Sequence, residues 1–255
     1  MRKYGLIGYP LGHSFSKEFF SRKFREEGIN AVYENFEMPV FGAKELYTLL
    51  LMNDDLCGFN VTAPWKEVIL PLLDTTDAKA QAAGAVNAVR VCRAADGRVV
   101  ALEGSNTDLE GFRLSIEPML NQLAPASRGA LILGTGGAAG AAEAVMKMSG
   151  YKIVKVSRTK TGEGYIPYAA IGRDVLEEYP VIINATPLGT YPDIDKCPDL
   201  PYGLISGRNL CFDLVYNPSP TLFLKKAAER GAMTKGGLEM LHNQALAAWD
   251  FWNGE

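Results

Sequence analysis

The chain has 255 residues, and a chain of this length can bury a substantial core without disulfides or bound metal. Hydrophobic residues make up 47% of it and charged residues 22%, as is typical of a globular protein. Its 26 Lys and Arg against 29 Asp and Glu give a net charge of −3. It therefore lacks the positive excess that sequence-independent binding to nucleic acid or to an anionic membrane requires, and we expect neither partner.

The cysteines and the N-terminal segment indicate whether the protein binds metal and in which compartment it is expected. The four cysteines form no C-x-x-C pair, and His13 and His242 are the only histidines, so the sequence predicts no metal site. The first residues contain no long apolar run of the kind found in signal peptides or membrane-spanning helices. We expect reduced thiols and a cytoplasmic location.

Apolar runs of strand length alternate with amphipathic segments, a pattern typical of an α/β fold with mainly parallel sheets. In the first part, strands are expected at residues 3–8, 31–37 and 58–62, and a helix at about 42–52. Ser14 suits the start of an earlier helix and Gly28 its end. Pro64 fits the first turn of a further helix. Asp96-Gly97 predicts an antiparallel hairpin of residues 87–93 and 98–103.

A second unit is expected after this hairpin. Its strands are predicted at residues 130–133, 152–156, 181–185 and 210–215, with helices after the first strand and at about 221–230. The final amphipathic segment, residues 238–252, is expected to pack back on the first unit. The sequence thus predicts two domains, one of residues 1–105 and 238–255 and a Rossmann-like one of residues 106–237.

A glycine-rich turn, Gly134-x-Gly136-x-x-Ala139, lies between a predicted strand and a helix, which is typical of dinucleotide binding. An NAD site would place Asp or Glu about 20 residues further on, to accept from the ribose 2′-hydroxyl. The segment there is Ser157-Arg158-Thr159-Lys160, whose guanidinium and hydroxyls suit a 2′-phosphate instead. The sequence therefore favours NADP over NAD, and the alternative is a solvated basic loop.

Lys66 and Asp108 are candidates for acid/base chemistry. Lys66 is expected in the first turn of the helix after Pro64, beside the positive end of the helix dipole. A Lys–Asp pair at a domain junction can donate a proton to a forming alkoxide. Each residue also has a plainer interpretation, Lys66 as a surface lysine and Asp108 as a helix N-cap, and their spacing does not establish that they meet.

Ser14 and Ser16 follow the first predicted strand. Two hydroxyls at a helix start can bind a carboxylate, although an N-cap serine with an incidental neighbour gives the same pattern. A hydrolase with Ser14, Asp213 and His242 as its triad is a rival hypothesis. It requires glycine two residues after the nucleophile, where this chain has Ser16, and it leaves the glycine-rich turn unexplained.

Taken together, motifs along nearly the whole chain resemble those of the shikimate dehydrogenase family. In chain order they are Gly8-Tyr-Pro-Leu-Gly-His-Ser-Phe-Ser16, Gly58-Phe-Asn-Val-Thr-Ala-Pro-Trp-Lys66, Gly84-Ala-Val-Asn87, Asn106-Thr-Asp108, Gly111-Phe112, Gly134-Thr-Gly-Gly-Ala138, Ser157-Arg-Thr159, Ile183-Asn-Ala-Thr186, Asp213-Leu-Val-Tyr216 with Pro218 and Thr221, and Gly237-Leu-Glu-Met-Leu-His-Asn-Gln-Ala245. Their joint order, rather than any one of them, carries the resemblance.

The resemblance implies reversible NADPH-dependent reduction of 3-dehydroshikimate to shikimate, in the biosynthesis of aromatic amino acids. It implies Lys66 as the general acid/base with Asp108 as its partner, and Ser14 and Ser16 on the ring carboxylate. The residues it places around the ring hydroxyls are Thr62, Asn87, Asp108, Tyr216 and Gln244. Those it places on NADP(H) are Gly134, Gly136, Gly137, Ala138, Ser157, Arg158 and Thr159, with Leu214 and Gly237 near the nicotinamide.

Four positions depart from the family pattern. Lys17, Pro187, Thr190 and Ser157 replace the usual Pro, Ser, Met and Asn. Two alternatives stay open, a relative that acts on quinate and a non-catalytic NADPH-binding regulator. The sequence leaves the choice between monomer and homodimer open.

Overall fold

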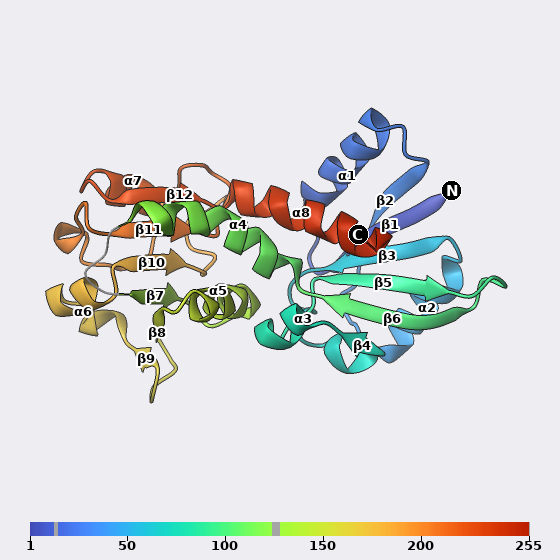
Figure 1. The fold of residues 1–255 in the computed structure, drawn as a ribbon, viewed down its shortest axis with the longest axis horizontal. Helices are drawn as coiled ribbons and strands as arrows, with labels where there is room; N and C mark the ends of the chain where they lie inside the picture. The colour runs from blue at the N-terminus through green and yellow to red at the C-terminus, as the bar shows by residue number, and fades with distance from the viewer. Residues whose placement is uncertain (13–14, 124–127, 255) are drawn as a thin grey trace. The chain divides into compact units, whose positions relative to one another are not determined.

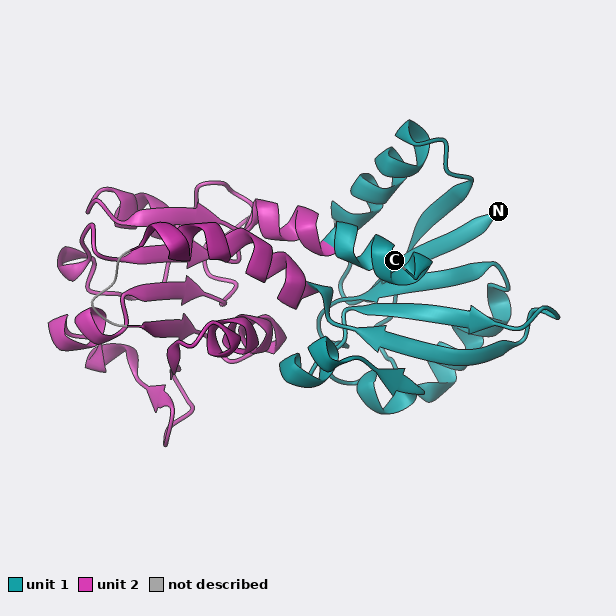
Figure 2. Cartoon of the chain, viewed as in Figure 1, with its two compact units in different colours: residues 1–107, 245–255 teal, residues 108–244 magenta. Residues whose placement is uncertain are grey.

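The computed structural model describes residues 1–12, 15–123 and 128–254. Their backbone contacts divide into two compact units, which Figure 2 shows in different colours. The first unit comprises residues 1–107 and 245–255, and the second comprises residues 108–244. The chain passes from one to the other at the start of α4 (Thr107–Gln122) and again within α8 (Leu238–Asn253).

A six-stranded mixed sheet forms the centre of the first unit, in the order β2-β1-β3-β5-β6-β4 (Figure 1). β1 pairs in parallel with β2 and β3, whereas β3, β5 and β6 pair antiparallel. The strands are β1 (Arg2–Gly8), β2 (Ala31–Glu37), β3 (Leu56–Val61), β4 (Thr75–Thr76), β5 (Ala88–Arg93) and β6 (Val99–Ser105). β5 and β6 confirm the hairpin predicted around Asp96-Gly97.

Helices cover both faces of this first sheet. On one face α2 (Ala43–Met52) and α3 (Ala78–Ala83) pack with Ile7 and Phe59, and the 3-10 turn η1 (Leu70–Leu72) lies against the same core. On the other face α1 (Phe15–Glu26) packs with Tyr4 and with the end of α8. Trp252 of α8 stacks on Tyr4 with ring centroids 4.9 Å apart. The final helix therefore packs on the first unit, as predicted.

The second unit contains an entirely parallel sheet in the order β12-β11-β10-β7-β8-β9. Its strands are β7 (Gly129–Leu133), β8 (Lys152–Val156), β9 (Tyr165–Ile166), β10 (Val181–Asn184), β11 (Leu210–Asp213) and β12 (Met233–Gly236). From β7 the chain adds β8 and β9 on one side of the sheet. It then adds β10, β11 and β12 on the other side of β7. This doubly wound topology is the one that binds dinucleotides at the carboxyl ends of its strands.

Alternate residues of β7 face two separate cores. Ala130 and Ile132 pack with α4 and α5 (Gly137–Met148), whereas Leu131 and Leu133 pack with α6 (Arg173–Glu178) and α7 (Leu222–Ala228). The turns η2 (Tyr168–Ala170) and η3 (Tyr202–Leu204) lie on the second of these faces. The two-domain α/β class predicted from the sequence is confirmed. In the described chain, no helix is both long enough and apolar enough to cross a membrane.

Candidate active site

The glycine-rich turn lies between β7 and α5, as predicted. Gly134 has φ +111°, and a Cβ there would come within 3.0 Å of the Ala185 carbonyl oxygen, so this position requires glycine. Gly136 is the N-cap of α5, makes no side-chain cap, and has nothing within 4 Å of an added Cβ. A helix start without a capping side chain, over an open backbone, is suited to a pyrophosphate group. Gly137 and Ala138 form the first turn of that helix.

The segment after β8 forms a tight turn around Ser157. The buried Ser157 hydroxyl oxygen accepts hydrogen bonds from the backbone N–H groups of Thr159, at 3.2 Å, and Lys160, at 2.9 Å. Arg158 and Thr159 are exposed on this turn. Ser157 therefore shapes the turn, while Arg158 and Thr159 are the groups that it presents outward.

Leu214 and Gly237, the residues expected near the nicotinamide, are brought together. Leu214 follows β11 directly and Gly237 follows β12, and the two strands are neighbours in the sheet. A Cβ added to Gly237 would overlap the Leu214 carbonyl oxygen. The Gly237 N–H also donates to the Val215 carbonyl oxygen at 3.3 Å. The close approach of these two loops therefore depends on glycine at position 237.

A buried carboxylate lies at the end of β11. Asp213 is fully buried and accepts hydrogen bonds from the Asn184 side-chain amide at 2.9 Å, the Val215 N–H at 3.0 Å and the Thr221 hydroxyl at 2.5 Å. Burial raises the pKa of Asp213 to about 6, and the three donors oppose that rise. Asn184 and Thr221 belong to motifs noted in the sequence, but no role was predicted for either. Asp213 was considered only as the acid of the rival hydrolase triad.

A second polar network runs through the first unit. The buried Tyr33 hydroxyl hydrogen-bonds with Ser16 and donates to the Asn60 side-chain oxygen at 2.8 Å. The Asn60 amide donates to the Asn87 carbonyl oxygen at 3.0 Å. In turn, the Asn87 side-chain oxygen accepts from the Thr107 N–H at 2.7 Å. Two expected substrate residues, Ser16 and Asn87, are thus connected, whereas Ser14 lies outside the described residues.

Tyr33 and Asn60 were missed by the sequence reasoning. Burial raises the pKa of Tyr33, and the hydrogen bond with Ser16 opposes that rise. A signal for Asn60 was available, since it is a polar residue inside the apolar strand β3 and is only 5% exposed. A buried amide in a strand needs partners on both of its polar atoms, and here Tyr33 and Asn87 supply them.

The predicted helix at Pro64 is wrong. Residues 63–69 form successive turns, and the next helical segment is the short 3-10 turn η1. The Lys66 carbonyl oxygen accepts from the Val86 N–H at 2.8 Å, and this bond to a distant segment takes the place of a helical one. The half-buried Lys66 is therefore not at a helix start, and the argument from a helix dipole does not apply to it. Its backbone is instead fixed next to Asn87.

The other expected substrate residues lie in the second unit, apart from Thr62. Asp108 is 9% exposed and occupies the second position of α4, so it is not the N-cap. Gln244 on α8 is buried, and its amide donates to the Leu241 carbonyl oxygen of the same helix. Tyr216, after β11, is exposed. Thr62 follows β3 in the first unit, where its side chain packs against Gly8.

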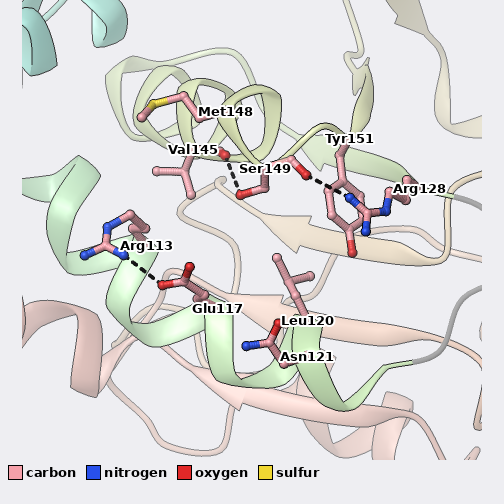
Figure 3. Close-up of a pocket in the computed structure, with 9 residues that line it drawn as sticks. All are labelled: Arg113, Glu117, Leu120, Asn121, Arg128, Val145, Met148, Ser149 and Tyr151. Atoms are coloured by element: carbon pink, nitrogen blue, oxygen red, sulfur yellow. Dashed lines mark hydrogen bonds and ion pairs between the residues drawn. The ribbon is translucent and has the colours of Figure 1, made fainter.

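A pocket of about 360 Å³ lies elsewhere in the second unit (Figure 3). It is lined by Arg113, Glu117, Leu120, Asn121, Arg128, Val145, Met148, Ser149 and Tyr151. Arg128 precedes β7 and Tyr151 precedes β8, whereas Gly134 and Ser157 follow the same strands. The pocket is therefore at the amino edge of the sheet, and the glycine-rich turn is at its carboxyl edge.

Known proteins match this chain over nearly its whole length. A family model described as "Shikimate dehydrogenase substrate binding domain" matches residues 6–89. A "Shikimate dehydrogenase (NADP(+))" of Shouchella clausii is 34% identical, over 99% of this chain and 93% of its own. The crystal structure of shikimate dehydrogenase 1 from Peptoclostridium difficile, also 34% identical, superposes with a TM-score of 0.81 and covers 100% of this chain and 92% of that one.

A further structure is shikimate 5-dehydrogenase from Thermus thermophilus in complex with NADP(H) and shikimate. It is 29% identical, with a TM-score of 0.82, and the match covers 100% of this chain and 94% of that one. The similarity therefore includes both compact units and every element that carries a candidate residue. On this full-length similarity, the chain belongs to the shikimate dehydrogenase family.

Proposed function

We propose that this protein catalyses the reversible, NADPH-dependent reduction of 3-dehydroshikimate to shikimate, in the biosynthesis of aromatic amino acids. The observation that carries the proposal is the match of 34% identity over 99% of the chain to a relative named as an NADP(+) shikimate dehydrogenase. The Thermus structure, with NADP(H) and shikimate bound, supports the same pairing of cofactor and substrate.

The residues at the carboxyl edge of the second sheet fit NADP(H). Gly134, Gly136, Gly137 and Ala138 would hold the pyrophosphate at the uncapped start of α5. Ser157, Arg158 and Thr159 would form the 2′-phosphate site, since no carboxylate lies in this turn to bind a free 2′-hydroxyl. Leu214 and Gly237 would lie near the nicotinamide. When bound, NADPH supplies the hydride that reduces the ring ketone.

Lys66 would donate the proton to the oxygen of the ketone as it becomes a hydroxyl, and would recover that proton in the reverse direction. Asp108 would orient the Lys66 ammonium and the new hydroxyl. Within the first unit, the Lys66 carbonyl oxygen accepts a hydrogen bond from the Val86 N–H. The Thr107 N–H donates to the side chain of Asn87, which directly follows Val86 in the sequence. This arrangement supports the pair, because Asp108 directly follows Thr107.

The remaining candidates would hold the substrate. Ser14 and Ser16 would bind the ring carboxylate with neutral donors, and the Tyr33 hydroxyl supports Ser16 in this role. The residues proposed for the ring hydroxyls and the pocket around them are Thr62, Asn87, Asp108, Tyr216 and Gln244. We further propose that the first unit is the substrate-binding domain, which the family model over residues 6–89 supports, and that the second is the nucleotide-binding domain.

We also propose that the protein is located in the cytoplasm. All four cysteines are free thiols, which fits a reducing, cytoplasmic compartment. The active form would be a monomer or a homodimer, and sedimentation of the purified protein distinguishes the two.

The test is the loss of NADPH absorbance with purified protein, followed in parallel with 3-dehydroshikimate and 3-dehydroquinate, and repeated with NADH. We expect turnover with 3-dehydroshikimate and NADPH to exceed that of every other pair. Faster turnover of 3-dehydroquinate would reassign the substrate. Binding of NADPH without turnover of either ketone would indicate a non-catalytic regulator.

A further inference from the structure

Asp213 is a buried charge that the proposed chemistry does not use. Its side chain is fully buried, and its three hydrogen-bond donors leave both oxygens acting as acceptors. No lysine or arginine among the described residues forms an ion pair with it. Three donors of this kind are what an ionised carboxylate requires. At neutral pH Asp213 therefore carries a buried negative charge that is balanced by the dipoles of these three hydrogen-bond donors.

The position of Asp213 in the sheet relates this charge to the cofactor. A dinucleotide lies across the carboxyl edge of a doubly wound sheet, with its pyrophosphate at the first turn and its two ends on opposite sides of it. The 2′-phosphate residues follow β8, on one side of β7. The nicotinamide of a bound cofactor would then lie on the other side, over β10 and β11. Asp213 is the last residue of β11, and Leu214 directly follows it.

We propose that Asp213 makes the cofactor site favour the oxidised nicotinamide over the reduced one. The ring of NADP⁺ carries one positive charge, and the ring of NADPH carries none. A fixed negative charge in a poorly solvated site lowers the free energy of the cationic ring and leaves that of the neutral ring nearly unchanged. This inference rests on the proposed function, since it requires a nicotinamide cofactor.

Asp213 acts on the cofactor through its charge and through the loops that it joins. Its hydrogen bonds connect the end of β10 at Asn184, the backbone after β11 at Val215 and the N-cap of α7 at Thr221. Loss of this connection would weaken the binding of both forms of the cofactor. Loss of the charge would weaken the binding of NADP⁺ alone, so the two roles are separable by comparing the two nucleotides.

Two substitutions separate charge from connection. Asp213→Asn keeps the size of the side chain and removes its charge. Thr221→Val removes one hydrogen bond to Asp213 and, when all titrations are done at pH 8.5, well above the Asp213 pKa of about 6, keeps the charge. Asp213→Ser is a second neutral variant, in case the asparagine side chain does not fit among three donors. Circular dichroism establishes that each variant is folded before the nucleotides are titrated.

The measurement is the dissociation constant of NADP⁺ and of NADPH, by calorimetry and by nicotinamide fluorescence. In Asp213→Asn or Asp213→Ser, we expect the ratio of the NADP⁺ constant to the NADPH constant to rise about tenfold. A unit charge about 10 Å away has an effect of this size at an effective dielectric constant of about 20. In Thr221→Val, both constants rise together and their ratio stays that of the wild type.

An unchanged ratio in every folded neutral variant would overturn this inference. A ratio that changes in Thr221→Val as much as in Asp213→Asn would also overturn it, because the effect would then follow the hydrogen bonds rather than the charge. These outcomes are distinct from failure of the proposed function, in which the wild-type protein would reduce neither ketone, whether or not it binds the nucleotides.

Discussion

At the scale of single residues, the proposed chemistry depends most on Lys66. We expect Lys66→Ala to lower kcat by about 10²–10⁴-fold and to change KM much less, because a positioned proton donor acts mainly in the transition state. Steady-state kinetics with 3-dehydroshikimate and NADPH measure the effect, and Lys44→Ala, an exposed lysine on α2, is the matched control. A variant with near wild-type kcat would remove Lys66 from the mechanism.

Arg158 is the second residue with a specific expectation. Arg158→Ala should weaken the binding of NADPH much more than that of NADH, since only NADPH carries the 2′-phosphate that a guanidinium binds. Titration of both nucleotides measures this, with Arg173→Ala, an exposed arginine at the start of α6, as the control. An equal loss for the two nucleotides would show that Arg158 does not bind the 2′-phosphate.

The candidate residues themselves could be proposed from the sequence, but the contacts around them could not be predicted. Lys66 and Arg158 belong to short local motifs, so their residue types and order along the chain were enough. The partners Tyr33 and Asn60 lie 27 residues apart in the sequence. They meet because their strands, β2 and β3, lie on either side of the same strand, β1, in the sheet. A contact of this kind follows from strand order, which no local pattern contains.

At the scale of secondary-structure elements, Gly237 determines how closely the loops after β11 and β12 approach. Gly237→Ala should destabilise the second unit by about 1–3 kcal/mol, the usual cost of overpacking, because the new methyl group would overlap the Leu214 carbonyl oxygen. Gly203→Ala is the matched control, because nothing lies within 4 Å of a Cβ there. Thermal unfolding followed by circular dichroism compares the two, and equal stabilities would contradict the close approach.

Tyr33 joins β2 to β3 through its hydroxyl group. Tyr33→Phe leaves the buried Asn60 oxygen without its 2.8 Å donor, and a buried acceptor left without a donor costs about 1–3 kcal/mol. We expect this loss in the unfolding of the first unit, together with a severalfold rise in the KM for the substrate and little change in kcat. Urea unfolding and steady-state kinetics test both. Tyr47→Phe, at an exposed tyrosine, should change neither quantity.

Elements differed in how well the sequence indicated them. The β5–β6 hairpin was evident because Asp96-Gly97 is a local turn signal, and Gly97 has φ +85° in the structure. The helix expected at Pro64 does not form, because the Lys66 carbonyl oxygen is bonded to the Val86 N–H, a partner that the local sequence does not indicate. The short strands β4 and β9 were missed, since two residues carry no periodicity.

At the scale of the whole molecule, Asp213 should make stability depend on pH. Its pKa rises from 3.8 in the unfolded chain to about 6 in the folded protein. Between these values the folded state holds a proton that the unfolded state has lost, so the free energy of unfolding falls as pH rises through this window. Below pH 3.8 the stability that depends on protonated Asp213 is fully present. Above about pH 6 it has been lost, and the free energy of unfolding is lower by an amount on the order of 3 kcal/mol.

The comparison that isolates this effect is the wild type against Asp213→Asn over the same pH range. Other carboxyl groups contribute equally to both proteins, so the difference between the two curves reports Asp213. The three tryptophans, Trp65, Trp249 and Trp252, all belong to the first unit, and their fluorescence does not report the second. Hydrogen exchange of β11 is the suitable probe, and parallel curves for the two proteins would rule out the linkage.

The first unit is discontinuous in sequence, and this has a consequence for biosynthesis. Ala245, Ala248 and Trp252 complete a core that begins at Tyr4. Residues 1–107 are synthesised long before these three residues. The first unit therefore begins to emerge first, but it can complete its core only after the second unit has been made. If synthesis paused within the second unit, the aromatic surface around Phe20 and Tyr33 would be exposed. Chaperones that bind apolar segments are expected to protect it until Trp252 has been made and can cover it.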